Sequence, residues 1–480
     1  MRQKTNTTLR VFLSLVIVSV MVTTSLMITH TAKSQSRNEA VEVTSVVPLA
    51  PVVSVPGQSD GIPVPPQYQI FDIGIVQPGD TASQGFGAST GGVAVGRSIR
   101  TGASQAFTWT RGGGIVGLPN LAGRPFAVSN AANDSGTVVG TGATTLFGSS
   151  RLPVVWQNGM VSQLPLPAGE TLGDANDVNA SGVAVGSVNG GSLQRAVIYS
   201  GSTATVITQT TAGGSFFTTA FGVNDSGRVV GPGIDPNNAA RNVGMVYDIG
   251  AGSAIEVGAL PGFNGALAFA VSNTGFVVGS SMLNQGSGLP FRWSLAGGIV
   301  PIPLAAGTSQ GSARAVNSAG WVVGNDSSAF SIPFLYDGTA TYRLADLIPA
   351  GTGWDLSMNT SSSALGISDA NVIVGTGVFN GAVHAYAMVP VVTNVSLGGR
   401  ILTSGGAGIR NTLVTVSGGD LPNPVIVQTG SFGSYSFQGL HSGQTYTVTV
   451  ATKRYVVTQP VRMVTPAANV SDFDFVAEPF

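Results

Sequence analysis

Histidine is the side chain that most often serves as a general acid–base group or metal ligand near neutral pH, and this sequence contains few of them. The three histidines among 480 residues are His30, in an apolar N-terminal segment, and His384 and His441, in two dissimilar later regions. No histidine pair is therefore expected to form a metal site unaided. Cysteine is absent, which excludes thiolate zinc sites, cysteine nucleophiles and disulfide frameworks.

Three other motifs that can carry chemistry are better explained as turns. The G-x-S-x-G pattern occurs as GQSDG, GASTG and GTSQG, but none of these opens a helix after a strand. The G-x-G-x-x-G pattern at Gly112–Gly117 lies in a predicted hairpin rather than in a βαβ unit. Asp174, Asn176 and Asn179 resemble part of a calcium loop, but the glutamate of an EF-hand is missing. We therefore predict a protein that is not an enzyme and has no metal and no cofactor.

Composition favours an exported all-β protein. Charged residues make up 9% of the chain, where about 25% is usual. The sequence has 21 basic and 22 acidic residues and no long run of either sign, so we expect no nucleic-acid partner. The 67 glycines and 26 prolines, together with 43% hydrophobic residues in short runs, indicate many strands and turns.

Residues 1–34 are predicted to be a secretory signal peptide. Basic residues among the first ten positions precede the apolar stretch VFLSLVIVSVMVTTSLM, and the small residues of Ala-Lys-Ser end at Ser34 as a cleavage site requires. The alternative is an uncleaved membrane anchor, since the stretch is near the lower length limit for a bilayer span. Residues 35–67 are rich in Pro, Val and Ser and are interpreted as a linker. We expect a secreted or cell-surface protein with no membrane span after cleavage.

Seven segments between residues 87 and 375 repeat one another. They read GASTGGVAVG, AANDSGTVVG, DVNASGVAVG, GVNDSGRVVG, AVSNTGFVVG, AVNSAGWVVG and GISDANVIVG. The closing glycines are Gly96, Gly140, Gly186, Gly231, Gly279, Gly324 and Gly375, which gives intervals of 44, 46, 45, 48, 45 and 51 residues. Periods near 45 are typical of one four-stranded propeller blade.

Each column of the repeat has a physical interpretation. Six glycines and Asn371 share the turn column, which predicts a positive φ there. Three positions earlier, Asn or Ser is expected to pin the turn by bonding the backbone two residues ahead. The two positions before each closing glycine are apolar, as in a sheet covered on both faces. The third strand of each repeat contributes an aromatic that we expect to pack between blades, namely Trp109, Trp156, Tyr199, Tyr247, Trp293, Tyr336 and Tyr386.

The last repeat lacks a fourth strand, and a spare strand, YQIFDIGIV, begins at Tyr68 before the first repeat. Pairing of the two would close a ring and leave no open radial edge. Residues 68–390 are thus predicted to form a seven-bladed β-propeller closed by an N-terminal strand. A linear β-solenoid is the alternative, but its coils are usually shorter.

The N-x-x-G-x-V-V-G motif, followed by strands such as QAFTW, PFRW and HAY, makes residues 68–390 similar to the HAF-repeat family of bacterial extracellular proteins. His384 is the one residue that retains the family's histidine. The resemblance implies an exported β-propeller without a general activity.

Residues 394–480 are a different module. The elements GGRILTSGGAGIRNTLV, GSYSFQGL and YTVTV resemble the carboxypeptidase regulatory-like, prealbumin-like domain. That resemblance implies a small accessory β-sandwich with Tyr435 and Phe437 in its core, and no peptidase activity.

Binding is expected at one face of the propeller. The second-to-third and inter-blade connections are long and variable, and exposed loops on a rigid scaffold usually carry recognition. The candidate ligand-binding residues in them are Arg97, Arg100, Asp235, Asn237, Asn238, Asp326, Trp354 and Asp355. Trp354 is preferred because it lies outside the aromatic column, although it could equally cover the core. The predicted function is a non-catalytic binding or adhesion scaffold for an unknown protein or glycan. A structural envelope or matrix protein and a glycan-active propeller enzyme are the alternatives.

Overall fold

The computed structural model describes residues 65–479 apart from 147–149, 192, 284–287, 306, 328–330, 358, 392–393, 420 and 467–468, and without the side chains of residues 240 and 327. The predicted signal peptide and all but the last three residues of the predicted linker lie outside the described residues. In the described part the chain is all-β except for one 3₁₀ turn, η1 (Leu344–Leu347). These described residues include no helix long and apolar enough to cross a membrane.

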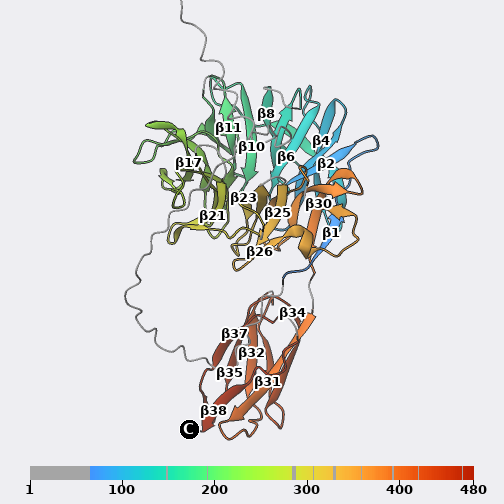
Figure 1. Ribbon diagram of the computed structural model, residues 1–480, viewed down its shortest axis with the longest axis vertical. Helices are drawn as coiled ribbons and strands as arrows, with labels where there is room; N and C mark the ends of the chain where they lie inside the picture. Colours follow the sequence, from blue (N-terminus) through green and yellow to red (C-terminus); the bar gives the residue numbers. More distant parts are fainter. Residues whose placement is uncertain are drawn as a thin grey trace, which may run out of the picture. The chain divides into compact units, whose positions relative to one another are not determined.

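The first three repeats each form one antiparallel four-stranded unit (Figure 1). The first unit is β2 (Ala82–Ala88), β3 (Ala94–Arg100), β4 (Ala103–Thr110) and β5 (Gly114–Gly117). The second is β6 (Phe126–Ala132), β7 (Val138–Ala143), β8 (Arg151–Gln157) and β9 (Met160–Gln163), joined to the first by one parallel bridge between Ser104 and Phe126. The third is β10 (Leu172–Val178), β11 (Ala184–Asn189), β12 (Arg195–Ser200) and β13 (Thr203–Val206).

The next three units follow the same order. The fourth splits its first strand into β14 (Phe216–Phe217) and β15 (Gly222–Val223), followed by β16 (Arg228–Asp235), β17 (Asn238–Asp248) and β18 (Ser253–Glu256). The fifth is β19 (Gly265–Val271), β20 (Val277–Met282), β21 (Gly288–Ser294) and β22 (Gly298–Pro301). The sixth is β23 (Gly311–Val316), β24 (Val322–Ser327), β25 (Ser331–Tyr336) and β26 (Thr341–Arg343).

The last unit joins the two ends of this region, as the sequence predicts. It comprises β27 (Trp354–Asp355), β28 (Ser363–Ile367), β29 (Ile373–Phe379), β30 (Ala382–Pro390) and β1 (Tyr68–Asp72). β1 pairs antiparallel with β30 along its whole length, from Tyr68 opposite Pro390 to Asp72 opposite Tyr386. Tyr68 is fully buried in an apolar core that the last unit shares with the sixth.

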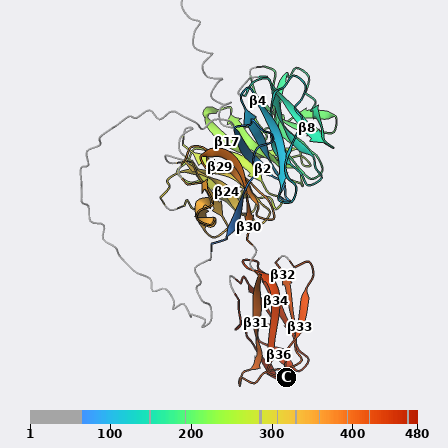
Figure 2. The same cartoon turned by 90° about the vertical axis from the view of Figure 1, so that its right-hand side faces the viewer.

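The first strands of successive units contact one another in a closed cycle. The order is β2, β6, β10, β15, β19, β23, β28 and back to β2. Figure 2 shows β2 beside β29 and β30, where the last unit meets the first. The apolar pair before each closing glycine is buried throughout, for example Ala94 and Val95 at 0% exposure, because each unit is covered on both faces.

A bulge recurs at one position of the first strand. In six units the register skips one residue, for example Asn130 between Ser129 and Ala131, and Phe221 lies at the equivalent position in the fourth. At the bulge, a carbonyl approaches the closing glycine of the second strand. A Cβ at any of these glycines would lie 1.8 to 2.1 Å from that oxygen, so only glycine fits.

The turn columns behave as predicted, with one correction. Gly182 and Gly320 have φ of 80° and 81°, and Asn371 has φ of 58°. The Asn/Ser side chain pins the turn by accepting from the backbone N–H four residues ahead, not two: Asn179 Oδ1 accepts from Val183 at 2.9 Å. Its amide also donates to the next unit, at 3.2 Å to the Asn224 carbonyl.

The predicted aromatic column is buried in six of the seven units, and Tyr336 is partly exposed. Packing within and between units is therefore the role of this column, as expected.

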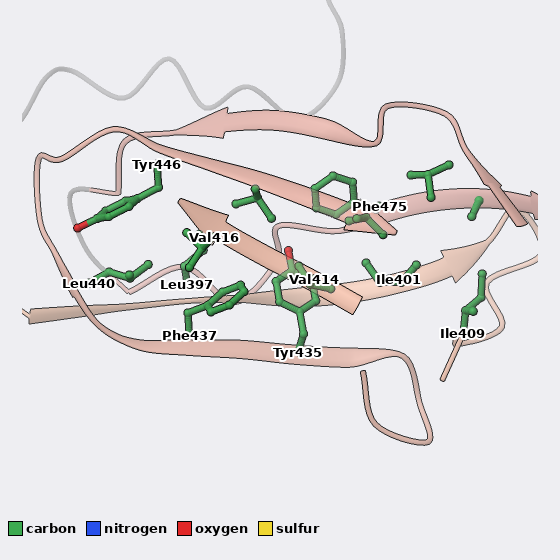
Figure 3. Packing of buried hydrophobic residues seen from close by; sticks show 14 of the residues in the cluster. Leu397, Ile401, Ile409, Val414, Val416, Tyr435, Phe437, Leu440, Tyr446 and Phe475 are labelled. Atoms are coloured by element: carbon green, nitrogen blue, oxygen red, sulfur yellow. The ribbon is translucent and has the colours of Figure 1, made fainter. Parts of the chain in front are cut away.

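Beyond Val391 the chain forms two further sheets. One has the order β34 (Ser434–His441), β31 (Asn394–Thr403), β38 (Phe475–Pro479), β36 (Tyr455–Val457). The other has the order β33 (Val425–Gln428), β32 (Leu413–Gly418), β35 (Tyr446–Ala451), β37 (Val461–Val464). Residues of both sheets share one apolar core, in which Tyr435 and Phe437 lie as predicted (Figure 3).

Candidate functional site

The first pair of candidate residues lies on strand β3 and not in a long exposed loop, so this expectation was wrong, because only residues 101 and 102 connect β3 to β4. Arg97 donates from Nε to Gln84 Oε1 at 2.9 Å and lies 5.6 Å from the centre of the Phe86 ring. Burial lowers the pKa of Arg97 to about 10, so it remains charged at neutral pH. Arg100 lies 3.8 Å from Asp80 Oδ1.

The second group lies at the hairpin between β16 and β17. Asp235 accepts from the Asn237 backbone N–H at 2.9 Å and pairs with Arg241 at 3.0 Å. These contacts lower the pKa of the Asp235 carboxyl, the Asn237 hydrogen bond being the largest cause. The side chains of Asn237 and Asn238 are exposed at the tip, as an exposed recognition loop requires.

Asp326 is not in an exposed loop, and this expectation was wrong. Strand β24 continues as far as Ser327, so Asp326 lies inside the sheet and has 0% exposure. Its Oδ2 accepts from Thr308 Oγ1 at 2.8 Å, while Oδ1 has no hydrogen-bond partner in the described part of the chain. Burial raises the pKa of this carboxyl to about 6. The residue is therefore unsuited to contact a partner at the surface.

The third group, Trp354 and Asp355, forms the two-residue strand β27 within the longest connection. Trp354 pairs with Phe379 and its indole stacks on that ring at 4.9 Å, with Tyr386 edge-on at 5.7 Å. The indole packs against the core of the last unit and is partly exposed. Trp354 thus covers the core, the alternative noted above, and also presents part of its surface. Asp355 is exposed and its Oδ1 accepts from the Ser357 N–H at 2.9 Å.

These residues share one end of their sheets but not one cluster. Each lies in or beside the second strand of its unit, toward the second-to-third connection. The sixth, seventh and first units, which hold Asp326, Trp354 with Asp355, and the two arginines, are consecutive in the cycle. The hairpin at Asp235 belongs to the fourth unit, which is adjacent to none of them.

An axial cavity was missed by the sequence analysis. It has a volume of about 230 Å³ and is lined by the first strands of all seven units. The bulge residues form one ring of its lining: Phe86, Asn130, Asn176, Phe221, Phe269, Arg314 and Leu365. Each lies six positions before the turn residue of its repeat. The available signal was that this column varies in size and chemistry, whereas the residue before it is small (Gly, Ser or Ala) in every repeat.

The rim of the cavity lies at the first-to-second turns, at the opposite end of the strands from the second-to-third connections. Asp134, Asp225 and Asp369 line it, and each bonds the preceding unit, as Asp369 does through the Ser318 N–H at 2.8 Å and the Ser318 hydroxyl at 2.9 Å. For Asp134, burial raises the pKa, but hydrogen bonds from Ser89, Thr90 and Gly91 outweigh it, and the net shift is downward. These carboxylates therefore tie the units together.

Asp177 is a further carboxylate in the lining. It accepts from the Val178 N–H at 2.9 Å and from the Val223 N–H of the next unit at 2.8 Å. Burial is the main cause that raises its pKa to about 7, and the nearby charge of Asp225 adds to the rise. Among the described residues, no three His, Asp or Glu side chains converge as metal ligands.

No family model and no curated protein matches this chain. Solved structures that resemble it include virginiamycin B lyase from Staphylococcus aureus, with 11% identity, a TM-score of 0.42, and coverage of 68% of this chain and 99% of that one. Oligogalacturonate lyase from Vibrio parahaemolyticus shows 9% identity and a TM-score of 0.41, with 67% and 97% covered. A putative TolB from Agrobacterium tumefaciens shows 13% identity and a TM-score of 0.35, with 67% and 97% covered. These likenesses concern the fold and carry no function.

Proposed function

We propose that this protein is an exported, non-catalytic binding or adhesion scaffold. In this proposal residues 68–390 are a seven-bladed β-propeller closed by β1, and residues 394–480 are a carboxypeptidase regulatory-like β-sandwich. The closed cycle of first-strand contacts and the β1–β30 pairing support the first assignment. The single apolar core shared by two four-stranded sheets supports the second.

The N-terminal sequence supports export to the cell surface or the medium, because basic residues, an apolar stretch and a small-residue site follow one another in the order of a secretory signal. Low charge and abundant Gly, Ser and Thr are consistent with an extracytoplasmic protein.

The observation that carries the binding proposal is the arrangement of β27. An indole held by Phe379 and Tyr386 is partly exposed, and an exposed carboxylate follows it directly in the chain. An aromatic surface whose orientation is already set loses little conformational entropy on binding. Trp354 and Asp355 at the loop end of the last unit would therefore contact a glycan or protein partner.

A glycan array and a pull-down with the mature chain test this proposal. We expect one saturable ligand whose affinity falls at least about tenfold in Asp355→Ala. The matched control is Asp248→Ala, since Asp248 makes the same kind of turn bond, accepting from the Ala251 N–H at 2.8 Å, at the opposite end of its sheet. Equal losses in the two variants, or no saturable ligand, would contradict the proposal.

A second candidate function is a glycan-active enzyme. The observation that favours it is the Asp177 carboxyl, which lines the axial cavity and has its pKa raised to about 7, suitable for a general acid. Polysaccharide cleavage that disappears in Asp177→Asn, with folding intact, would replace the binding proposal with this one.

A further inference from the structure

Arg314 is a partly buried cation whose Nε–H has no acceptor in the described part of the protein. It is the bulge residue of β23, and its guanidinium lies 4.4 Å from the centre of the Phe269 ring. Its Nε is buried without a hydrogen-bond partner. Burial lowers the pKa of Arg314 to about 10, so the group is still charged at pH 7. A buried N–H without an acceptor destabilises a fold, which calls for an explanation outside folding.

Other arginines of the same region do have acceptors. Arg151 lies 3.2 Å from Asp174, and Arg292, which also covers an aromatic ring, donates to the Gly320 carbonyl at 3.4 Å. Contact with an aromatic ring therefore does not explain why the Nε–H of Arg314 lacks an acceptor. What sets this residue apart is its position in the lining of the axial cavity.

Two asparagines from other units also line the cavity. Asn130 donates from Nδ2 to the Ala175 carbonyl at 2.8 Å, and Asn176 donates to the Ala220 carbonyl at 2.9 Å. One N–H of each amide is used in this way, so the Oδ1 atom and the second N–H of each of these lining residues can still bond a ligand. These residues belong to the second and third units, whereas Arg314 belongs to the sixth, so the two sets lie across the cycle from one another.

We propose that the axial cavity binds a small organic carboxylate. The carboxylate lies against the Arg314 guanidinium, and hydroxyl or ammonium groups at the other end of the ligand donate to Asn130 and Asn176. A guanidinium fork matches a carboxylate in shape and charge. This site opens at the first-to-second turns and is independent of the proposed loop-end site.

The volume of the cavity and the charges at its rim limit the class of ligand further. The cavity of about 230 Å³ is smaller than the roughly 300–1,000 Å³ of drug-sized pockets, so it takes one small molecule or the end of a chain. The rim carboxylates Asp134, Asp225 and Asp369 repel polyanions, which argues against phosphate esters.

Calorimetry with the mature full-length chain tests the proposal. The probes are glucuronate, which offers hydroxyl donors, and γ-aminobutyrate, which offers an ammonium donor; glucose and inorganic phosphate are the controls. We expect saturable binding of at least one of the two carboxylates, and the one that binds identifies the donor group. Glucose and phosphate are expected to bind at least about tenfold more weakly.

Arg314→Met keeps the length of the side chain and its contact with Phe269 but removes the charge. We expect it to weaken carboxylate binding at least about tenfold and to leave the ligand-free unfolding temperature unchanged or raised. The matched control is Arg292→Met, which removes an arginine from a ring outside the cavity and should leave binding unchanged.

Three results would overturn the proposal: neither carboxylate binds at concentrations up to about 10 mM, glucose binds as well as the carboxylates, or Arg314→Met retains full affinity. If Arg314→Met does not fold, the Arg314→Lys variant tests the proposal instead. Lysine keeps the positive charge but loses the two-pronged guanidinium, so we expect it to bind the carboxylate more weakly than wild type does. Unchanged binding contradicts the proposal.

Discussion

Adding one methyl group to Gly186 tests the close approach between the first and second strands. The new Cβ would lie 1.9 Å from the Asp174 carbonyl oxygen and 3.0 Å from Ala175 Cα. Because even a close C···O contact is about 3.3 Å, the two strands would have to separate by about 1.4 Å. That movement disrupts the pairing of Ala175 with Gly186 beside the bulge. We expect Gly186→Ala to lower the free energy of unfolding by about 3 to 5 kcal/mol.

The matched control is Gly182→Ala in the same repeat. Gly182 has a φ of 80°, and a Cβ there would meet no atom within 4 Å. The cost is then conformational alone, about 1 kcal/mol after the gain from a stiffer unfolded chain. Urea unfolding of both variants, followed by circular dichroism and by tryptophan fluorescence, measures the difference and tests whether unfolding stays cooperative. Equal losses, or a smaller loss for Gly186→Ala, would refute the explanation of the closing glycines.

Two further predictions concern Asp326 and the closing strand. The folded pKa of Asp326, about 6, lies above the ordinary value of 3.8, so the stability gained from the protonated carboxyl is fully present below pH 4 and is lost as the pH rises to 6. Asp326→Asn should remove that fall, which is about 3 kcal/mol at most; a wild-type stability that is flat from pH 4 to 6 would refute the burial argument. Deleting Tyr68–Asp72 removes every partner of β30 on that side and leaves two sheet edges open, so a lower unfolding temperature and aggregation are expected in a thermal scan with light scattering. A deletion variant as stable as the wild type would show that β1 is dispensable.

Much of the fold could be predicted from residues that recur in register. The turn glycines, the apolar pair beside Gly186 and the aromatic column depend on local backbone conformation and burial, which one repeat encodes by itself. The pairing of β1 with β30 was also predictable, because a missing strand at one end matched a spare strand at the other. Local backbone conformation is the level of structure that can be predicted most directly from a sequence.

The site depended on contacts that no single repeat contains. Asp326 looked like a loop residue, but β24 extends beyond it to Ser327 and the residue is fully buried. Asn179 looked like a turn residue alone, yet its amide reaches Asn224 in the next unit. Arg314 stood in a column without an evident role until closure of the cycle brought seven such residues around one cavity. The sequence by itself determined the repeat and its strands, whereas tertiary structure decided which side chains share a space, because that depends on residues about 45 positions or more apart in the chain.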